Sequence, residues 1–87
     1  MMHEPSYAER VRYRQLQDTA YQAGQDAVAN LQAALALAGL VLPSLANDGP
    51  VGCRGFVRLG GCSVALANQL AEVITAGARA LQDQQQR

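Results

Sequence analysis

Residues 20–42, AYQAGQDAVANLQAALALAGLVL, decide the fold because their apolar residues recur at helical spacing along two neighbouring lines. We call these lines the first and second seams; they are offset by one residue and lie about 100° apart on a helix. Within 20–42, twelve of the fourteen seam positions are apolar. The first seam consists of Tyr13, Leu16, Ala20, Ala23, Ala27, Asn30, Ala34, Leu37 and Val41, and the second of Tyr21, Gly24, Val28, Leu31, Leu35, Ala38 and Leu42. A helix with two adjoining seams needs neighbours on two sides.

The two ends of this first helix carry recognisable signals. In residues 6–9, SYAE, the Ser hydroxyl can accept a hydrogen bond from the amide three residues on, where Glu completes a capping box. Gly39 is the expected stop. Leu42 is the alternative, because Pro43 disfavours helical angles at the residue before it. We therefore predict a helix over about 7–38, about 48 Å long at 1.5 Å per residue.

A second helix is expected over about 62–83, where apolar doublets repeat at the same spacing, and a polar tail follows over 84–87. Cys62 or Ser63 can cap its first turn. Nine of the ten doublet positions are apolar. The doublets are Leu66/Ala67, Leu70/Ala71, Val73/Ile74, Gly77/Ala78 and Ala80/Leu81.

Two helices with two apolar lines each predict a homodimer, because in a hairpin each helix has only one neighbour and a second copy of the chain must cover the remaining lines. The expected fold class is all-α: a single domain, 1–87, forms a helical hairpin, and two hairpins dimerise into a four-helix bundle. The composition supports association, because sixteen Ala and one Phe give an 87-residue chain a marginal core of its own. Gly24 and Gly77 would permit close helix approach. Asn30 either fixes the register of the bundle or is a tolerated, partly exposed residue.

The connector, 39–61, is rich in glycine, and a short extended segment is expected over 53–59, which in a dimer could pair with its twin. Glycines let a ligand approach the backbone, while guanidinium groups and helix-start amides attract anions. A candidate anion-binding site comprises Arg54, Arg58, Gly60 and Gly61. The pattern matches neither the phosphate loop nor the dinucleotide fingerprint. We therefore favour the simpler interpretation, a glycine-rich turn between the helices.

Cys53 and Cys62 are interpreted as two small buried residues, with a reversible redox pair as the alternative. A disulfide would close a ten-residue loop, but a cytosolic setting opposes stable oxidation. No metal or cofactor is predicted, since zinc needs four ligands and the single histidine, His3, is remote. The carboxylates are scattered singly on outward faces and cannot form an acid–base or nucleophilic site with one histidine. Enzyme activity is therefore not expected.

Residues 7–16, which we call the N-terminal overhang, are the candidate partner-binding segment. The first helix is longer than the second, so in a hairpin this segment extends beyond its neighbour, with three of the seven Arg and two of the three Tyr. Tyr and Arg are enriched at interface hot spots. Arg10 and Arg14 can equally form a solvated face supported by Asp18. The predicted partner-binding residues are Tyr7, Arg10, Val11, Arg12, Tyr13 and Arg14.

These features predict a small regulatory or adaptor protein that acts as a homodimer by binding another protein. One alternative is a nucleic-acid-binding accessory protein that uses the Arg/Tyr-rich N-terminal helix, a hypothesis weakened by a net charge of zero. The other is a small-ligand sensor that uses the loop with Arg54 and Arg58.

The expected location is the cytoplasm of a bacterium. The longest apolar run, 33–42, is ten residues, which is too short to cross a membrane, and no apolar segment of a secretory signal follows the N-terminus. Association with a membrane is the least favoured hypothesis. All cations are Arg and none is Lys, which is typical of a GC-rich genome.

Overall fold

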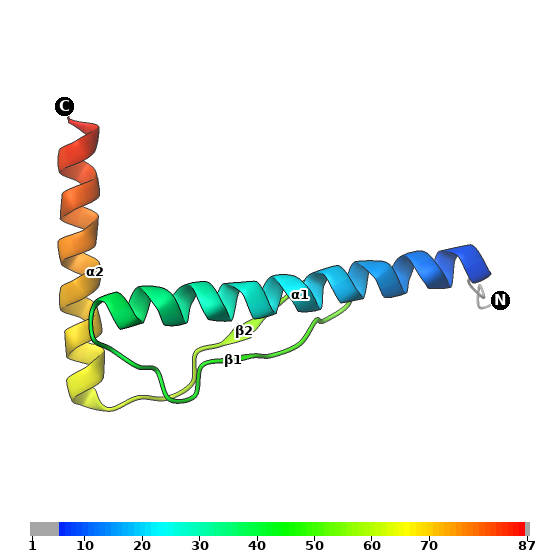
Figure 1. The fold of residues 1–87 in the computed structure, drawn as a ribbon, viewed down its shortest axis with the longest axis horizontal. Helices are drawn as coiled ribbons and strands as arrows, with labels where there is room; N and C mark the ends of the chain where they lie inside the picture. The colour runs from blue at the N-terminus through cyan, green and yellow to red at the C-terminus, as the bar shows by residue number, and fades with distance from the viewer. Residues whose placement is uncertain (1–5, 87) are drawn as a thin grey trace.

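The computed structural model of the chain describes residues 6–86 and contains two long helices with a small two-stranded sheet between them (Figure 1). Helix α1 is Tyr7–Leu37, strand β1 is Ala46–Asn47, strand β2 is Val57–Arg58 and helix α2 is Val64–Gln85. The prediction of two helices joined by a glycine-rich connector is confirmed. The sheet is an addition to the all-α class that the sequence indicated.

Both helices begin with a serine cap. The Ser6 hydroxyl accepts a hydrogen bond from the amide of Glu9 at 3.2 Å, as the capping box predicts. Ser63 does the same for the amide of Leu66 at 3.1 Å, so α2 starts at residue 64 rather than at 62.

Helix α1 ends in a Schellman motif built on Gly39. This glycine has φ +71°, a conformation that side chains with a Cβ rarely adopt. Its amide donates to the carbonyl of Ala36 at 3.0 Å, and the amide of Leu40 donates to the carbonyl of Leu35 at 2.9 Å. Leu35 and Leu40 are both buried, which is the apolar contact that accompanies this motif. The chain therefore reverses direction at Gly39 and runs back along α1.

The returning connector forms an antiparallel β-hairpin over residues 44–60, which we call the connector hairpin (Figure 1). Its register pairs residue 46 with 58 and residue 47 with 57. At the tip, Val51 and Arg54 exchange two backbone hydrogen bonds of 2.9 and 3.2 Å around a two-residue turn. Gly52 has φ +61° at the first turn position, where a type II′ turn requires glycine. The extended segment predicted over 53–59 thus contains β2, which pairs with β1 of its own chain.

One bulge separates the tip from the rest of the connector hairpin. Between the two paired regions, Gly49 and Pro50 of the first arm oppose a single residue, Gly55, of the second. Gly49 has φ +78°, as expected for the first residue of a glycine bulge. Bulges increase strand twist, so the tip and the base of the connector hairpin face in different directions.

The connector hairpin lies against α1 where both surfaces are nearly bare backbone. Ala20 is 6% exposed beneath it. A Cβ on Gly55 would come within 2.7 Å of the Ala20 carbonyl oxygen, and a Cβ on Gly24 would come within 2.5 Å of Asn47 Oδ1. Glycine at positions 24 and 55 is therefore what permits this contact. Gly24 was predicted to allow close approach, and the element that approaches it is the connector hairpin.

Asn47 ties the connector hairpin to the helix. Its Nδ2 donates to the carbonyl oxygen of Tyr21 at 3.0 Å and to Oε1 of Gln25 at 3.3 Å. Its Oδ1 accepts the amide of Gly49 at 3.0 Å, which also orders the start of the bulge. The Asn47 side chain thus makes hydrogen bonds both to α1 and to the backbone of the connector hairpin.

The connector hairpin covers the side of α1 that carries the second seam. Gly24 and Leu35 are buried there, and Val28 and Leu31 are half-buried. The first seam remains exposed from Ala23 to Leu37. One of the two neighbours that the double seam demands is therefore supplied by the connector itself.

Helix α2 stands at the C-terminal end of α1 and runs crosswise to it (Figure 1). Among the described residues, no Cα of α2 comes within 8 Å of a Cα of α1 or of either strand. The antiparallel pairing of α1 and α2 that the sequence predicted is therefore not formed between these helices of one chain. The connector hairpin takes the place of α2 on the second-seam side of α1, and the first seam stays uncovered. The radius of gyration is 18.5 Å, against about 12 Å for a compact domain of this length.

The contact between Gly24 and Asn47 predicts a non-additive pair of mutations. Gly24→Ala alone should lower the free energy of unfolding by about 1–2 kcal/mol, because the new Cβ displaces the Asn47 amide and its hydrogen bonds. In an Asn47→Ala background the same Gly24→Ala change should instead be stabilising by up to about 1 kcal/mol, the ordinary helix preference for Ala. Urea unfolding followed by circular dichroism measures all four corners of the cycle. Equal effects of Gly24→Ala in both backgrounds would contradict the contact.

Candidate functional site

The N-terminal overhang extends α1 beyond the connector hairpin, and every residue from 7 to 16 is exposed (Figure 1). Tyr7 is 82% and Tyr13 50% exposed, so both rings are accessible to a binding partner. The overhang is therefore a rigid rod of side chains, positioned by the cap at Ser6 at one end and by the contact at Ala20 at the other.

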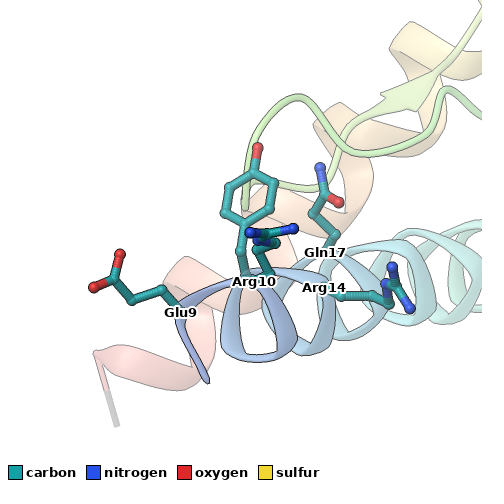
Figure 2. Close-up of a pocket in the computed structure, with 5 residues that line it drawn as sticks. Glu9, Arg10, Arg14 and Gln17 are labelled. Atoms are coloured by element: carbon teal, nitrogen blue, oxygen red, sulfur yellow. The ribbon is translucent and has the colours of Figure 1, made fainter. Parts of the chain in front are cut away.

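One face of the overhang gathers most of its functional groups. Helical spacing places Arg10, Tyr13, Arg14 and Gln17 on adjoining turns of this face. With Glu9 they border an open hollow of about 600 Å³. In Figure 2, Glu9 and Arg14 extend to opposite sides of the hollow, and Arg10 and Gln17 lie between them.

The structure thus brings together half of the residues predicted to bind a partner. Arg10, Tyr13 and Arg14 share the hollow, whereas the other three do not line it: Tyr7, Val11 and Arg12. Gln17 was missed by the sequence analysis, although it follows Tyr13 and Arg14 at spacings of four and three residues.

The chemistry of the hollow is that of a docking surface. Two guanidinium groups and a phenol can hold carboxylates through charge-assisted hydrogen bonds, and the Tyr13 ring offers an apolar surface beside them. The hollow lies along a single helix with no opposing wall, so it suits a segment of another macromolecule better than an enclosed small molecule.

A second hollow, of about 470 Å³ and mostly apolar, lies at the other end of α1, where the Schellman motif reverses the chain. It was not foreseen, although the apolar run 33–42 supplies most of its lining. Leu37 and Val41 beside it are 92% and 74% exposed, so this end of the molecule also lacks a cover. The lining residues are Gln32, Leu35, Ala36, Gly39, Leu40, Val41 and Leu42.

The residues of the predicted anion site are spread along the connector hairpin. Arg54 lies at the tip, whereas Gly60 lies at the base, where its Cα packs against Ser44. The six residue steps from Arg54 to Gly60 in a largely extended strand span on the order of 20 Å. Gly61 follows in open space. The structure therefore does not assemble these residues into one anion cradle.

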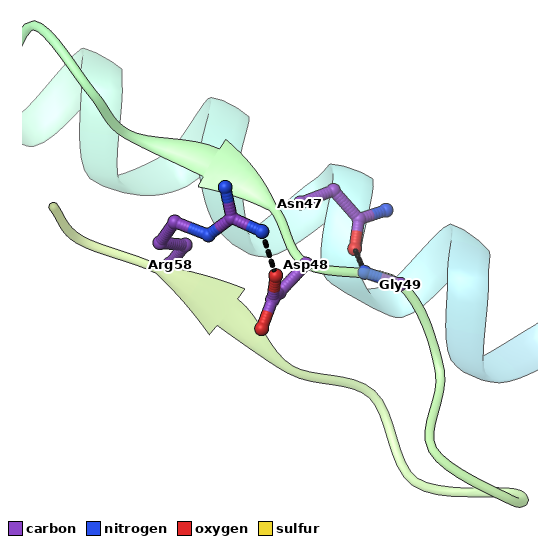
Figure 3. A network of polar contacts seen from close by, with 4 residues as sticks. All are labelled: Asn47, Asp48, Gly49 and Arg58. Carbon is purple, nitrogen blue, oxygen red and sulfur yellow. Dashed lines mark hydrogen bonds and ion pairs between the residues drawn. The ribbon is translucent and has the colours of Figure 1, made fainter.

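Arg58 is already engaged within the connector hairpin. Its guanidinium forms an ion pair with the carboxylate of Asp48 on the opposite arm (Figure 3). The two side chains are 65% and 43% exposed, so the pair contributes at most about 1 kcal/mol. It nevertheless neutralises one of the two cations that the anion site would need.

Both cysteines are exposed free thiols, so the prediction that they are buried is wrong. Cys53 is the second residue of the two-residue turn at the tip of the connector hairpin. Cys62 stands between this hairpin and the serine cap of α2. The largely extended arm between them holds the two thiols apart, well beyond the Cα separation of under about 7 Å that a disulfide needs.

Residues 6–86 contain no group of three or more His, Cys, Asp or Glu side chains that could hold a metal ion. His3, the single histidine considered as a ligand, lies outside the described residues. Neither described helix is long and apolar enough to cross a membrane.

Comparison of the chain with protein-family models, curated proteins and solved structures finds no match. A functional assignment therefore rests on the chain's own exposed surfaces.

The exposure of the thiols predicts fast modification of the native protein. Iodoacetamide should alkylate Cys53 and Cys62 at rates within a few-fold of those in 6 M guanidinium, because neither sulfur is shielded. Mass spectrometry of timed samples counts the labels. Protection of either thiol by more than about tenfold in the native state would show that it is covered.

Proposed function

We propose that this protein is a small non-enzymatic regulator or adaptor that acts as a homodimer and binds another protein through the N-terminal overhang. The observation that carries the proposal is the amount of helical apolar surface that one chain leaves uncovered. This surface comprises the first seam of α1 and the doublets of α2, where Val73, Ile74 and Leu81 are 43%, 62% and 61% exposed.

A second copy of the chain supplies the missing cover. In proteins most of the stability of a helix comes from packing of its apolar face, and α2 packs on no helix or strand of its own described chain. In the proposed dimer the doublets of the two α2 helices pack on each other and the first seams of the two α1 helices do the same, with the connector hairpins on the outer sides. This arrangement becomes a four-helix bundle once α2 turns from its crosswise position to lie along α1. Each copy then has a neighbour on both sides of α1, as the double seam requires.

The overhang stays accessible in such a dimer and determines what it binds. It carries three Arg against one Glu, so it is cationic although the chain as a whole has a net charge of zero. The proposed ligand is therefore an acidic segment of a partner protein, whose carboxylates meet Arg10 and Arg14 while an apolar residue packs on Tyr13.

A nucleic-acid-binding accessory role is the second candidate, supported by the same face. An exposed tyrosine between two arginines can stack on a base while the guanidinium groups contact phosphates. The neutral chain and the adjacent Glu9 rank it below protein binding.

We further propose that the protein works in the cytoplasm of a bacterium. Two exposed thiols remain reduced there, whereas an oxidising compartment would cross-link them between molecules.

The dimer is tested by light scattering coupled to size-exclusion chromatography at micromolar concentration. The expected mass is twice the chain's 9.2 kDa. Helicity by circular dichroism should fall together with the dimer on dilution, because α2 depends on association. A fully helical particle of 9.2 kDa would overturn the proposal.

The overhang is tested by affinity capture from the native organism with a triple variant, Arg10→Ala/Tyr13→Ala/Arg14→Ala. We expect the variant to remain dimeric and to capture at least tenfold less of the partner than the unmodified protein does. Arg79→Ala is the matched control, because Arg79 is an exposed arginine on the polar face of α2, outside the overhang, and its removal should change capture less than twofold. Undiminished capture by the triple variant would place the binding site elsewhere. A gel shift at low salt that the triple variant abolishes would favour nucleic acid instead.

A further inference from the structure

Helix α2 offers an uncovered face of an unusual composition. The doublets mix large and small residues, and none of their ten positions carries a charge. Along the first line Leu66, Leu70 and Val73 precede Gly77 and Ala80, and along the second Ile74 and Leu81 are the large residues among alanines. On the opposite face lie Asn68, Glu72, Thr75 and Arg79, whereas Gln84 and Gln85 continue the two lines at the end of the helix. Every doublet residue is exposed except Leu66 and Leu70, which are half-buried.

We propose that the α2 helices of two copies pair antiparallel about a two-fold axis at the level between Thr75 and Ala76. This inference rests on the homodimer proposed above and gives it a specific interface and register. The occupant of the α2 face is thus the same face of a second copy.

The argument is the complementarity of side-chain sizes. In an antiparallel pair with this axis, facing positions along each apolar line bring a large residue opposite a small one. Val73 meets the partner's Gly77, Leu70 meets the partner's Ala80, and the second line repeats the pattern. Its pairs are Ile74 with the partner's Ala78 and Leu81 with the partner's Ala71. Layers of nearly equal volume result, as close packing requires.

Other arrangements of the same helices pack unevenly. A parallel pair in register places Leu70 against its twin in one layer and Gly77 against its twin in another, so crowded layers alternate with empty ones. Moving the antiparallel pair by one heptad puts Leu70 opposite Val73 in one direction. In the other direction it puts Gly77 opposite Ala80, which leaves a void.

The proposed axis also gives the longest overlap. It lies within about one residue of the middle of α2, so nearly the whole helix, about 30 Å, is covered by its twin. Glycine or alanine in each of these four pairs lets the helix axes approach to about 8 Å, the near end of the usual range. Beyond them Leu66 faces the partner's Gln84 at each end of the overlap. The polar face of each α2 remains turned to water.

Disulfide trapping between two single-cysteine variants tests the register. In a Cys53→Ser/Cys62→Ser background, Val73→Cys and Gly77→Cys chains are made separately, one with a mass tag, then mixed and oxidised with copper phenanthroline. We expect at least tenfold more tagged–untagged cross-link than cross-link between identical chains on a non-reducing gel. A mixture of Leu70→Cys and Ala80→Cys gives the same readout if Gly77→Cys disturbs the helix.

The matched control uses Glu72→Cys mixed with Arg79→Cys. These positions have the same relation to the axis but lie on the polar face, so they should not cross-link. Strong cross-linking of this control pair, or a majority of cross-links between identical Val73→Cys chains, would overturn the antiparallel register.

Light scattering of the same samples separates the two proposals. Cross-linking in both tested pairs together with a dimer mass supports the register. A dimer mass without any of these cross-links overturns the α2 interface and leaves the homodimer standing. A monomer mass overturns both.

Discussion

The connector hairpin packs against α1 with its backbone almost touching the helix backbone. The coverage of the second seam depends on this contact. Gly24 and Gly55 remove the side chains that would hold the two elements apart, and the Asn47 amide then bonds to the Tyr21 carbonyl. With the connector hairpin seated there, the second seam is covered, and a second helix has no room on that side. Helix α2 packs on neither seam and runs crosswise, which leaves the chain extended.

The proposed dimer is a consequence of how the chain divides its apolar surface. The connector hairpin buries little side-chain volume, since its contact is made with glycine, alanine and one asparagine. Most of the aliphatic surface of α1 and α2 is therefore left for association. Each Å² of apolar surface that association removes from water contributes roughly 25 cal/mol. In a small alanine-rich chain, covering these aliphatic surfaces is therefore the main further source of stability.

The helices could be predicted from the sequence, because their signals are local: the serine caps, the glycine stop at residue 39 and the 3.6-residue period. The connector hairpin could not, since each strand is two residues long and pairing depends on contacts far apart in sequence. The wrong prediction that the cysteines are buried has the same cause. Cys53 is exposed because it lies in the turn of the connector hairpin, and the hairpin itself could not be predicted. The overhang was predicted from unequal helix lengths, but the structure leaves it exposed because the connector hairpin ends near Ala20.

The isolation of α2 within its own chain has a consequence for the protein's lifetime in a cell. In a single copy α2 packs on no described helix or strand, so its backbone hydrogen bonds should open more readily than those of α1 beneath the connector hairpin. Such a segment is the first that a protease can engage. Degradation of a scarce chain would then outpace its accumulation, whereas abundant chains would persist, so that turnover itself would respond to the rate of synthesis.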